Sequence, residues 1–180
     1  MKKMFAGILT LLVAVGGIAA QHEQNMKHPV AASPTPQAMA QHHAFLEEER
    51  GAIERGEGFG MALAADKNGY PGPKHVLEMK KELKLTPAQE AAMDKLMVEM
   101  KTKALAKGKD VLLAEKRLEE LFAQGKSEDE LREETYRVAS LRAELRWVHL
   151  ATHLAAKKIL TAKQIAAYQQ IRHGQGMKAQ

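Results

Sequence analysis

The sequence predicts an all-α protein, built as an elongated antiparallel helical hairpin with short flanking helices. The main observation is a repeat of apolar residues at alternating spacings of three and four, which runs over residues 93–121 and resumes over 138–159. The second observation is that 45% of the residues are hydrophobic but only 4% are aromatic, so the core is expected to consist of Leu, Met and Ala. The third is the turn signal Gln124-Gly125-Lys126 between the two repeats, which makes the two long helices antiparallel neighbours.

The first 20 residues have the layout of a secretory signal. Lys2 and Lys3 precede an apolar run over residues 4–15, and small residues follow up to Ala20. We expect cleavage after Ala19 or Ala20, export to a bacterial-type periplasm, and no stable membrane insertion afterwards. The alternative is an uncleaved membrane anchor, for which the run is short, since a spanning helix needs about 20 apolar residues.

The mature chain should begin with a tail and continue as one helical domain. Residues 21–41 combine prolines with polar residues, contain several His and Met, and show no helical periodicity, which predicts a disordered, mobile tail. The helical domain is expected over residues 42–175. Its first part should hold three short helices, over about residues 45–55, 58–66 and 73–84. Gly56 separates the first two, and a turn cluster over residues 68–73 precedes the third.

Two long helices dominate the predicted architecture. An S-x-x-E capping box at Ser127 starts the second one, and a further helix should follow Thr161. Each long helix has more than thirty residues and spans roughly 50 Å at 1.5 Å per residue. Gly108 predicts a bend in the first of them, because glycine weakens a helix interior.

The second long helix has two apolar stripes and therefore needs two apolar neighbours. One stripe faces the partner helix; the other comprises Ala143, Trp147, Leu150 and Leu154. The second neighbour could be the short helices, the C-terminal helix or a second subunit. We favour the second subunit and expect a homodimer.

The composition excludes several classes of protein. The chain has no cysteine, which rules out disulfides, thiolate metal sites, a cysteine nucleophile and a lipoprotein anchor. The formal net charge of +5 becomes +3 when Lys2 and Lys3 are removed, which is too weak for a nucleic-acid-binding protein. Motifs of nucleophilic, phosphate-binding or zinc-protease catalysis are missing from the sequence. We expect a non-enzyme that requires no cofactor.

One motif occurs twice. Leu85-Thr86-Pro87-Ala88-Gln89 and Leu160-Thr161-Ala162-Lys163-Gln164 share the pattern L-T-x-x-Q, 75 residues apart. Each copy reads as a helix start, because the threonine oxygen can accept the backbone N–H of the glutamine while the glutamine side chain caps the threonine N–H. For either copy alone, the simplest interpretation is an ordinary capping box. Two copies that both begin with leucine are less expected from that interpretation.

The signal sequence, the absence of cysteine, the Met- and Leu-rich helices and the doubled motif together resemble the Spy/CpxP family of periplasmic proteins, which has zinc-associated and heavy-metal-resistance relatives. The resemblance covers about residues 75–173. It implies a cradle-like helical dimer that acts as an ATP-independent chaperone in envelope or metal stress and binds unfolded periplasmic proteins. It also implies two alternatives, a periplasmic metal-binding sensor or buffer and an inhibitor of a membrane sensor kinase. The matching motif residues are expected to have a structural role: Leu85, Thr86, Gln89, Leu160, Thr161 and Gln164.

Histidines are the candidate metal ligands. His149 and His153 are four residues apart on the second long helix, a spacing that lets two imidazoles reach one Zn²⁺, Cu²⁺ or Ni²⁺ ion. Two arginines on the same polar face would repel a cation, so solvated or structural histidines are the favoured alternative. Cleavage after Ala19 would place His22 third in the mature chain, where a free amine and a histidine can bind Cu²⁺ or Ni²⁺.

Methionines are the candidate client contacts. Their unbranched thioether side chains can repack around varied apolar partners, and four of them precede or begin the first long helix: Met79, Met93, Met97 and Met100. The favoured alternative is that they belong to the core of the hairpin.

Overall fold

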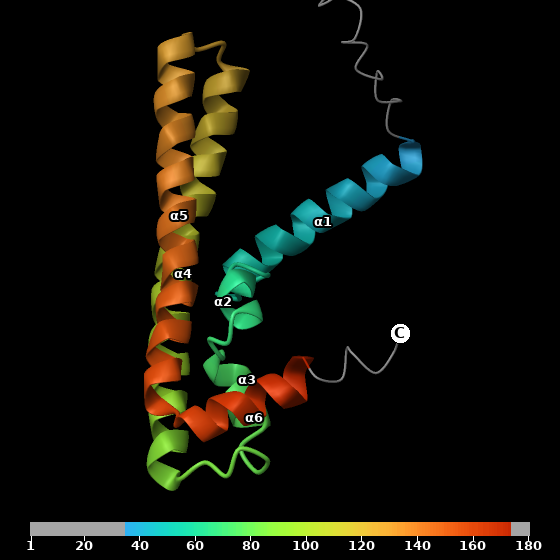
Figure 1. Cartoon of the computed structure of the whole chain (residues 1–180). Helices are drawn as coiled ribbons and strands as arrows, with labels where there is room; N and C mark the ends of the chain where they lie inside the picture. Colours follow the sequence, from blue (N-terminus) through green and yellow to red (C-terminus); the bar gives the residue numbers. More distant parts are fainter. Residues whose placement is uncertain (1–34, 174–180) are drawn as a thin grey trace, which may run out of the picture. The chain divides into compact units, whose positions relative to one another are not determined.

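The computed structural model describes residues 35–173, and all regular secondary structure in that range is helical, which confirms the all-α class. The helices are α1 (Pro36–Glu54), α2 (Leu63–Lys67), α3 (Pro73–Glu78), α4 (Pro87–Ala123), α5 (Glu128–Ile159) and α6 (Ala162–His173) (Figure 1). The chain divides into two units, residues 1–39 and 40–180. Of the first unit only residues 35–39 are described, so the expected signal sequence over residues 1–20 lies outside the described residues.

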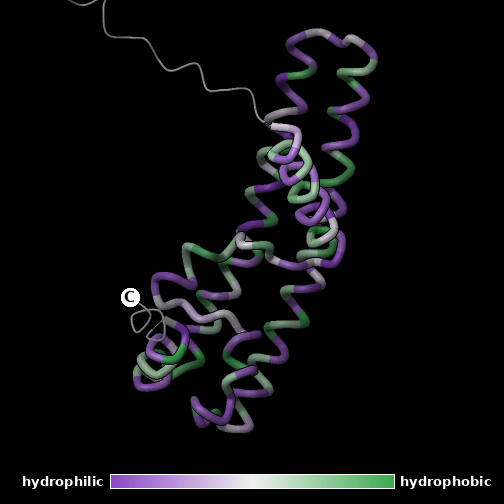
Figure 2. Tube along the Cα trace, turned by 90° about the vertical axis from the view of Figure 1, so that its right-hand side faces the viewer, coloured by the Kyte–Doolittle hydropathy of each residue, from purple (hydrophilic) through white to green (hydrophobic). Residues whose placement is uncertain are grey.

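Helices α4 and α5 form the expected antiparallel hairpin and lie side by side (Figure 1). At 1.5 Å per residue, their 37 and 32 residues span about 55 and 48 Å. Hydrophobic residues recur at intervals along both helices rather than in continuous runs (Figure 2), as helices that bury one face require. The homodimer stays a prediction.

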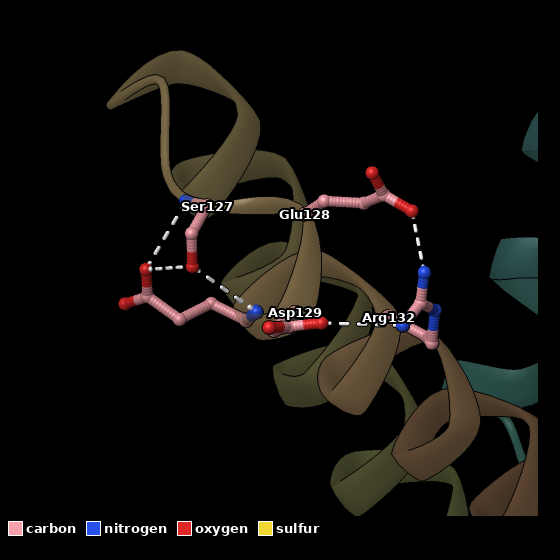
Figure 3. Close-up of polar contacts among 5 residues, drawn as sticks. Ser127, Glu128, Asp129 and Arg132 are labelled. Atoms are coloured by element: carbon pink, nitrogen blue, oxygen red, sulfur yellow. Dashed lines mark hydrogen bonds and ion pairs between the residues drawn. The ribbon is translucent and has the colours of Figure 1, made fainter.

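The start of α5 is stabilised by local contacts among residues 127–132 (Figure 3). Ser127 Oγ accepts the backbone N–H of Glu130, and the Glu130 carboxylate accepts the N–H of Ser127 at 3.1 Å. Three acidic residues in the first turn face the positive end of the helix dipole. Arg132 pairs with two of them, Glu128 and Asp129.

Helix α1 begins earlier than expected and covers the end of the segment that was predicted as a tail, residues 21–41. The reason is a helix cap that the proline content concealed. Thr35 Oγ1 accepts the N–H of Ala38 at 3.2 Å, and Pro36 occupies the first helical position. A proline there lacks only an N–H that the helix leaves unpaired in any case, so it starts the helix instead of breaking it.

Helices α2 and α3 are shorter than the sequence predicts. α2 covers only Leu63–Lys67, and α3 ends at Glu78, after which the chain continues in turns. These turns close at Lys84, which has a φ of 50°, while the N–H of Leu85 donates to the carbonyl of Lys80 at 3.0 Å. That geometry is a Schellman closure, and it directs the chain into the first motif copy.

Two buried clusters form the core of the second unit. One lies where α3, α4, α5 and α6 meet and comprises Val76, Leu83, Met93, Ala156, Leu160 and Tyr168. The other joins α1 to the hairpin and comprises Ile53, Ala104, Val111 and Leu145. None of the helices within residues 35–173 combines the length and the apolar character that a membrane crossing needs.

Gly108 allows α1 to pack closely against α4 of the hairpin. A Cβ atom at this position would stand 2.8 Å from the backbone oxygen of Ile53, a distance that only glycine avoids. Helix α4 is continuous through Gly108, and the bend predicted there stays a prediction.

Candidate functional site

The two copies of the L-T-x-x-Q motif meet at the open end of the hairpin. Gln89 Nε2 donates to Gln164 Oε1 at 2.9 Å, and Gln164 Nε2 donates back to Gln89 Oε1 at 3.0 Å. Each side chain also caps its own helix: Gln89 Oε1 accepts the Thr86 N–H at 3.1 Å, and Gln164 Oε1 accepts the Thr161 N–H at 2.9 Å. We name this reciprocal amide pair the glutamine clasp. It joins the starts of α4 and α6, which are 75 residues apart in the sequence.

The clasp uses every hydrogen-bonding position of both amides. Gln89 Nε2 also donates to the carbonyl of Ile159 at 2.9 Å, and Gln164 Nε2 donates to that of Leu83 at 3.2 Å. A side-chain amide has two donor hydrogens and two acceptor sites, and all are occupied. Each glutamine therefore holds its own helix start and the chain that leads to the other motif copy.

The need for donors explains why the motif contains glutamine. Capping alone requires only an acceptor, and at the start of α5 the same chain uses Glu130 for it. Sequence reasoning found the two caps but missed that they contact each other. The contrast between glutamine at two helix starts and glutamate at the third was the available signal. The motif leucines complete the site, since Leu160 is buried and Leu85 packs against the same core cluster.

A buried polar group fastens α6 to α2. The hydroxyl of Tyr168, a fully buried residue, donates to Asp66 Oδ1 at 2.7 Å, and Arg172 donates to Oδ2 at 3.2 Å. Burial alone would raise the pKa of Asp66, but the bonds from Tyr168 and Arg172 outweigh burial and hold that pKa below its usual value. Burial and the bond to Asp66 raise the pKa of Tyr168, so it stays a donor. Sequence reasoning missed this group, because only the folded chain brings α2 and α6 together.

The histidine pair on α5 lies in a different environment from the solvated polar face that the helical wheel predicts. His149 is only 3% exposed, and its Nε2 has no hydrogen-bond partner in the structure. His153 is half-buried, and its Nδ1 lies 2.7 Å from the carbonyl oxygen of Tyr70. The difference arises because the segment between α1 and α3 crosses α5 at both rings.

The metal hypothesis gains no further ligand from the fold. Within residues 35–173, groups of three or more His, Cys, Asp or Glu side chains that could hold an ion are absent. His149 and His153 thus remain a pair, which is short of the three or four protein ligands that a zinc site uses. The other candidate ligand, His22, lies outside the described residues.

An open groove of about 950 Å³ lies between α1 and the hairpin. Charged side chains of both signs surround an apolar lining that includes Leu46, Ile53, Leu105, Leu112, Leu113 and Phe122. Two of these, Leu113 and Phe122, are 55% and 62% exposed. Arg142 of α5 links the two sides of the groove, because it donates hydrogen bonds to Glu115 of α4 at 2.7 Å and to Glu49 of α1 at 3.2 Å.

The four methionines differ in burial, and their contact with clients stays a prediction. Met93 is fully buried in the core cluster at the open end of the hairpin. Met79, Met97 and Met100 are half-buried. The larger exposed apolar side chains along the hairpin are Leu, Val and aromatic residues, which sequence reasoning did not select as client contacts.

A family model, that of the LTXXQ motif family protein, matches residues 72–172. The matched range contains both motif copies, the whole hairpin and nearly all of α6, and it leaves α1 and α2 outside. No curated protein and no solved structure matches the chain.

Proposed function

Because the chain belongs to the LTXXQ motif family, we propose that it is a chaperone-like protein of the periplasm that holds unfolded or misfolded proteins without nucleotide. Members of this family are usually periplasmic, and the family is non-enzymatic. The envelope as its location, release from a cleaved signal sequence and the binding of unfolded clients are parts of the proposal.

The observation that supports client binding most directly is the groove beside α1. An unfolded chain exposes apolar side chains next to charges of both signs, and the groove offers exposed Leu113 and Phe122 among charges of both signs. Apolar contact of this kind is non-directional, so it can accept many sequences. The surrounding charges would attract clients at long range before apolar contact forms.

The test is the suppression of aggregation of a chemically denatured model protein, without ATP and without metal. The protein at a near-stoichiometric ratio should suppress light scattering by the client. The double variant Leu113→Ser/Phe122→Ser should lose most of this effect. The matched control is Val98→Ser/Tyr136→Ser, which removes two large side chains that are at least as exposed and do not line the groove. Equal loss in both variants would show that the groove has no special part, and no suppression by the wild type would refute the proposal.

We propose in addition that two copies pair through the second apolar stripe of α5. Trp147 of that stripe is 59% exposed and Leu154 is 39% exposed, so the stripe remains only partly covered within one chain. Complete burial of an exposed apolar side chain contributes about 1.5–3 kcal/mol, and the part of Trp147 and Leu154 that is still exposed would contribute a fraction of that. Sedimentation equilibrium should report a dimer for the wild type and a shift toward monomer for Trp147→Ser. The chain has a single tryptophan, so its emission should also shift to the blue as concentration rises.

A further inference from the structure

Charge is distributed unevenly over the described residues. Residues 66–96 and 152–173 form the end of the molecule that carries the glutamine clasp, and we name them the clasp end. They contain ten Lys and Arg but only five Asp and Glu. The rest of the hairpin, residues 97–151, contains eleven of each, and residues 35–65 contain two Lys and Arg against five Asp and Glu. The surplus of positive charge is therefore confined to the clasp end.

Four exposed lysines surround the glutamine clasp. Lys81 and Lys84 share one turn, in which the Lys84 N–H donates to the Lys81 carbonyl at 3.1 Å. The clasp amides bond to this turn and to the end of α5, which places Lys163 of α6 and Lys158 of α5 at the same end. In Figure 1, α3, α6 and the start of α4 lie together there, opposite the turn between α4 and α5. All four lysines are exposed, and none of them forms an ion pair within residues 35–173.

The chemistry of the clasp end differs from that of a protein–protein interface. Nine of its ten cations are lysines, whereas residues 97–151 have six Lys and five Arg. Interfaces between proteins are enriched in Arg and depleted in Lys, and they are built around apolar or aromatic anchors. Among the large hydrophobic side chains that are exposed within residues 35–173, the clasp end contributes only Leu154, at 39%. Lysines without apolar anchors suit a surface whose negative charge is spread out.

We propose that the clasp end docks on an anionic membrane surface, with its lysines against the phosphate headgroups. None of the helices within residues 35–173 would enter the hydrocarbon, in keeping with their polar character. An ammonium group is a compact point charge that the phosphates of several neighbouring lipids can satisfy. Each lysine at such a surface contributes about fivefold to the binding constant, so four contribute about 600-fold. Glu82, the one acidic residue in the turn of residues 79–86, offsets part of this.

Docking through the clasp end leaves the groove free. The α4 residues that line the groove begin at Leu105, which is 18 residues, or about 27 Å, from the helix start at Pro87. The groove would therefore stay away from the lipid and open to clients. The docking proposal rests on the proposed periplasmic location, since membranes bound that compartment, but it does not rest on client binding.

Cosedimentation with sucrose-loaded vesicles tests the proposal, with the protein purified after export. At about 0.05 M salt the wild type should bind vesicles of equal parts phosphatidylglycerol and phosphatidylcholine, and it should not bind vesicles of phosphatidylcholine alone. Binding should be lost at about 0.5 M salt, because the screening length shortens. The variant Lys81→Gln/Lys84→Gln/Lys163→Gln should bind the anionic vesicles about 100-fold more weakly.

The matched control is Lys101→Gln/Lys103→Gln/Lys109→Gln, which removes the same charge from exposed positions of α4. Lys101 lies 14 residues, or about 21 Å, from the start of α4 at Pro87, which is beyond the screening length. The control should therefore bind the anionic vesicles within about twofold of the wild type. Far-ultraviolet circular dichroism should show that both triple variants remain as helical as the wild type.

Four results would overturn the proposal. The first is a wild type that does not bind the anionic vesicles, and the second is equal binding to both kinds of vesicle. The third is an equal loss of binding in the two triple variants. The fourth is a wild type that binds polyglutamate but not the vesicles, which would identify an acidic protein segment as the partner. Because the assay contains no client, a failure to suppress aggregation would leave the vesicle result standing, and the reverse also holds.

Discussion

Replacing Gln89 by glutamate separates the two roles of this side chain in the glutamine clasp, which are to accept a hydrogen bond as a helix cap and to donate hydrogen bonds across the clasp. The new carboxylate can still accept the Thr86 N–H, so the cap of α4 remains. A negative charge at a helix start is also favourable by about 0.3–1 kcal/mol. The carboxylate cannot donate, however, so the 2.9 Å bonds to Gln164 Oε1 and to the Ile159 carbonyl are both lost.

The expected cost follows from these two bonds. Each contributes about 1 kcal/mol, and two acceptor oxygens that now face a carboxylate add about 1 kcal/mol more. After the gain at the helix start is subtracted, Gln89→Glu should lower the free energy of unfolding by about 2 kcal/mol at neutral pH. The matched control is Glu130→Gln, which alters a third-position cap where only an acceptor is used, and which should cost less than about 1 kcal/mol.

Urea unfolding followed by far-ultraviolet circular dichroism measures both variants. A protonated carboxyl group regains a donor, so the folded clasp should raise the pKa of the new side chain above its usual value of about 4.3. Stability that comes from a raised pKa is present in acid and is lost as the pH rises, so the deficit of Gln89→Glu should shrink near pH 4. Equal costs for Gln89→Glu and Glu130→Gln, with no pH dependence, would refute the reciprocal donation.

Three further substitutions test other parts of the fold. Tyr168→Phe removes the donor to Asp66 and should lower the free energy of unfolding by about 1.5–3 kcal/mol in urea titrations, because the acceptor is charged. Since the pKa of Asp66 is lowered, its contribution is present above about pH 4 and is lost as the pH falls, so this deficit should narrow in acid. Gly108→Ala should lower the Tm, because the added methyl group would meet the backbone oxygen of Ile53. At a solvent-exposed helix position the same change would stabilise the helix by about 1 kcal/mol, so a higher Tm contradicts the close approach. Lys84→Gly should raise the free energy of unfolding by about 1 kcal/mol, because the backbone there has positive φ; an unchanged urea midpoint contradicts this.

Local signals in the sequence predicted the helices that depend on local chemistry. The bounds of α4 and α5 follow from capping residues and from the 3-4 repeat, which act within a few positions. The start of α1 was misjudged because Pro36 was counted with the tail and Thr35 was not recognised as its cap. The error lay in the interpretation of the prolines, since the T-P pair at residues 86–87 was read correctly as a helix start.

The features that the sequence did not predict depend on segments that are distant along the chain. The helical wheel placed His149 with solvated residues, because a wheel contains no information about the segment between α1 and α3, which crosses the helix at this ring. Gly108 was interpreted only as a weak point in the helix, and its close contact with Ile53 of α1 was not foreseen. The clasp was within reach, because an antiparallel hairpin that closes at residues 124–127 must bring Gln89 and Gln164 to the same end.

The position of the clasp also bears on the order in which the chain folds. The turn at residues 124–127 closes a very short loop, whereas the clasp closes one of 75 residues, and loop closure costs more as the loop lengthens. The hairpin should therefore form from its turn and proceed toward the open end, so that the clasp is made last. Interactions absent from the transition state act on the unfolding rate alone. The paired glutamines would then contribute to kinetic stability by slowing unfolding. Substitutions there should accelerate unfolding and leave the folding rate nearly unchanged.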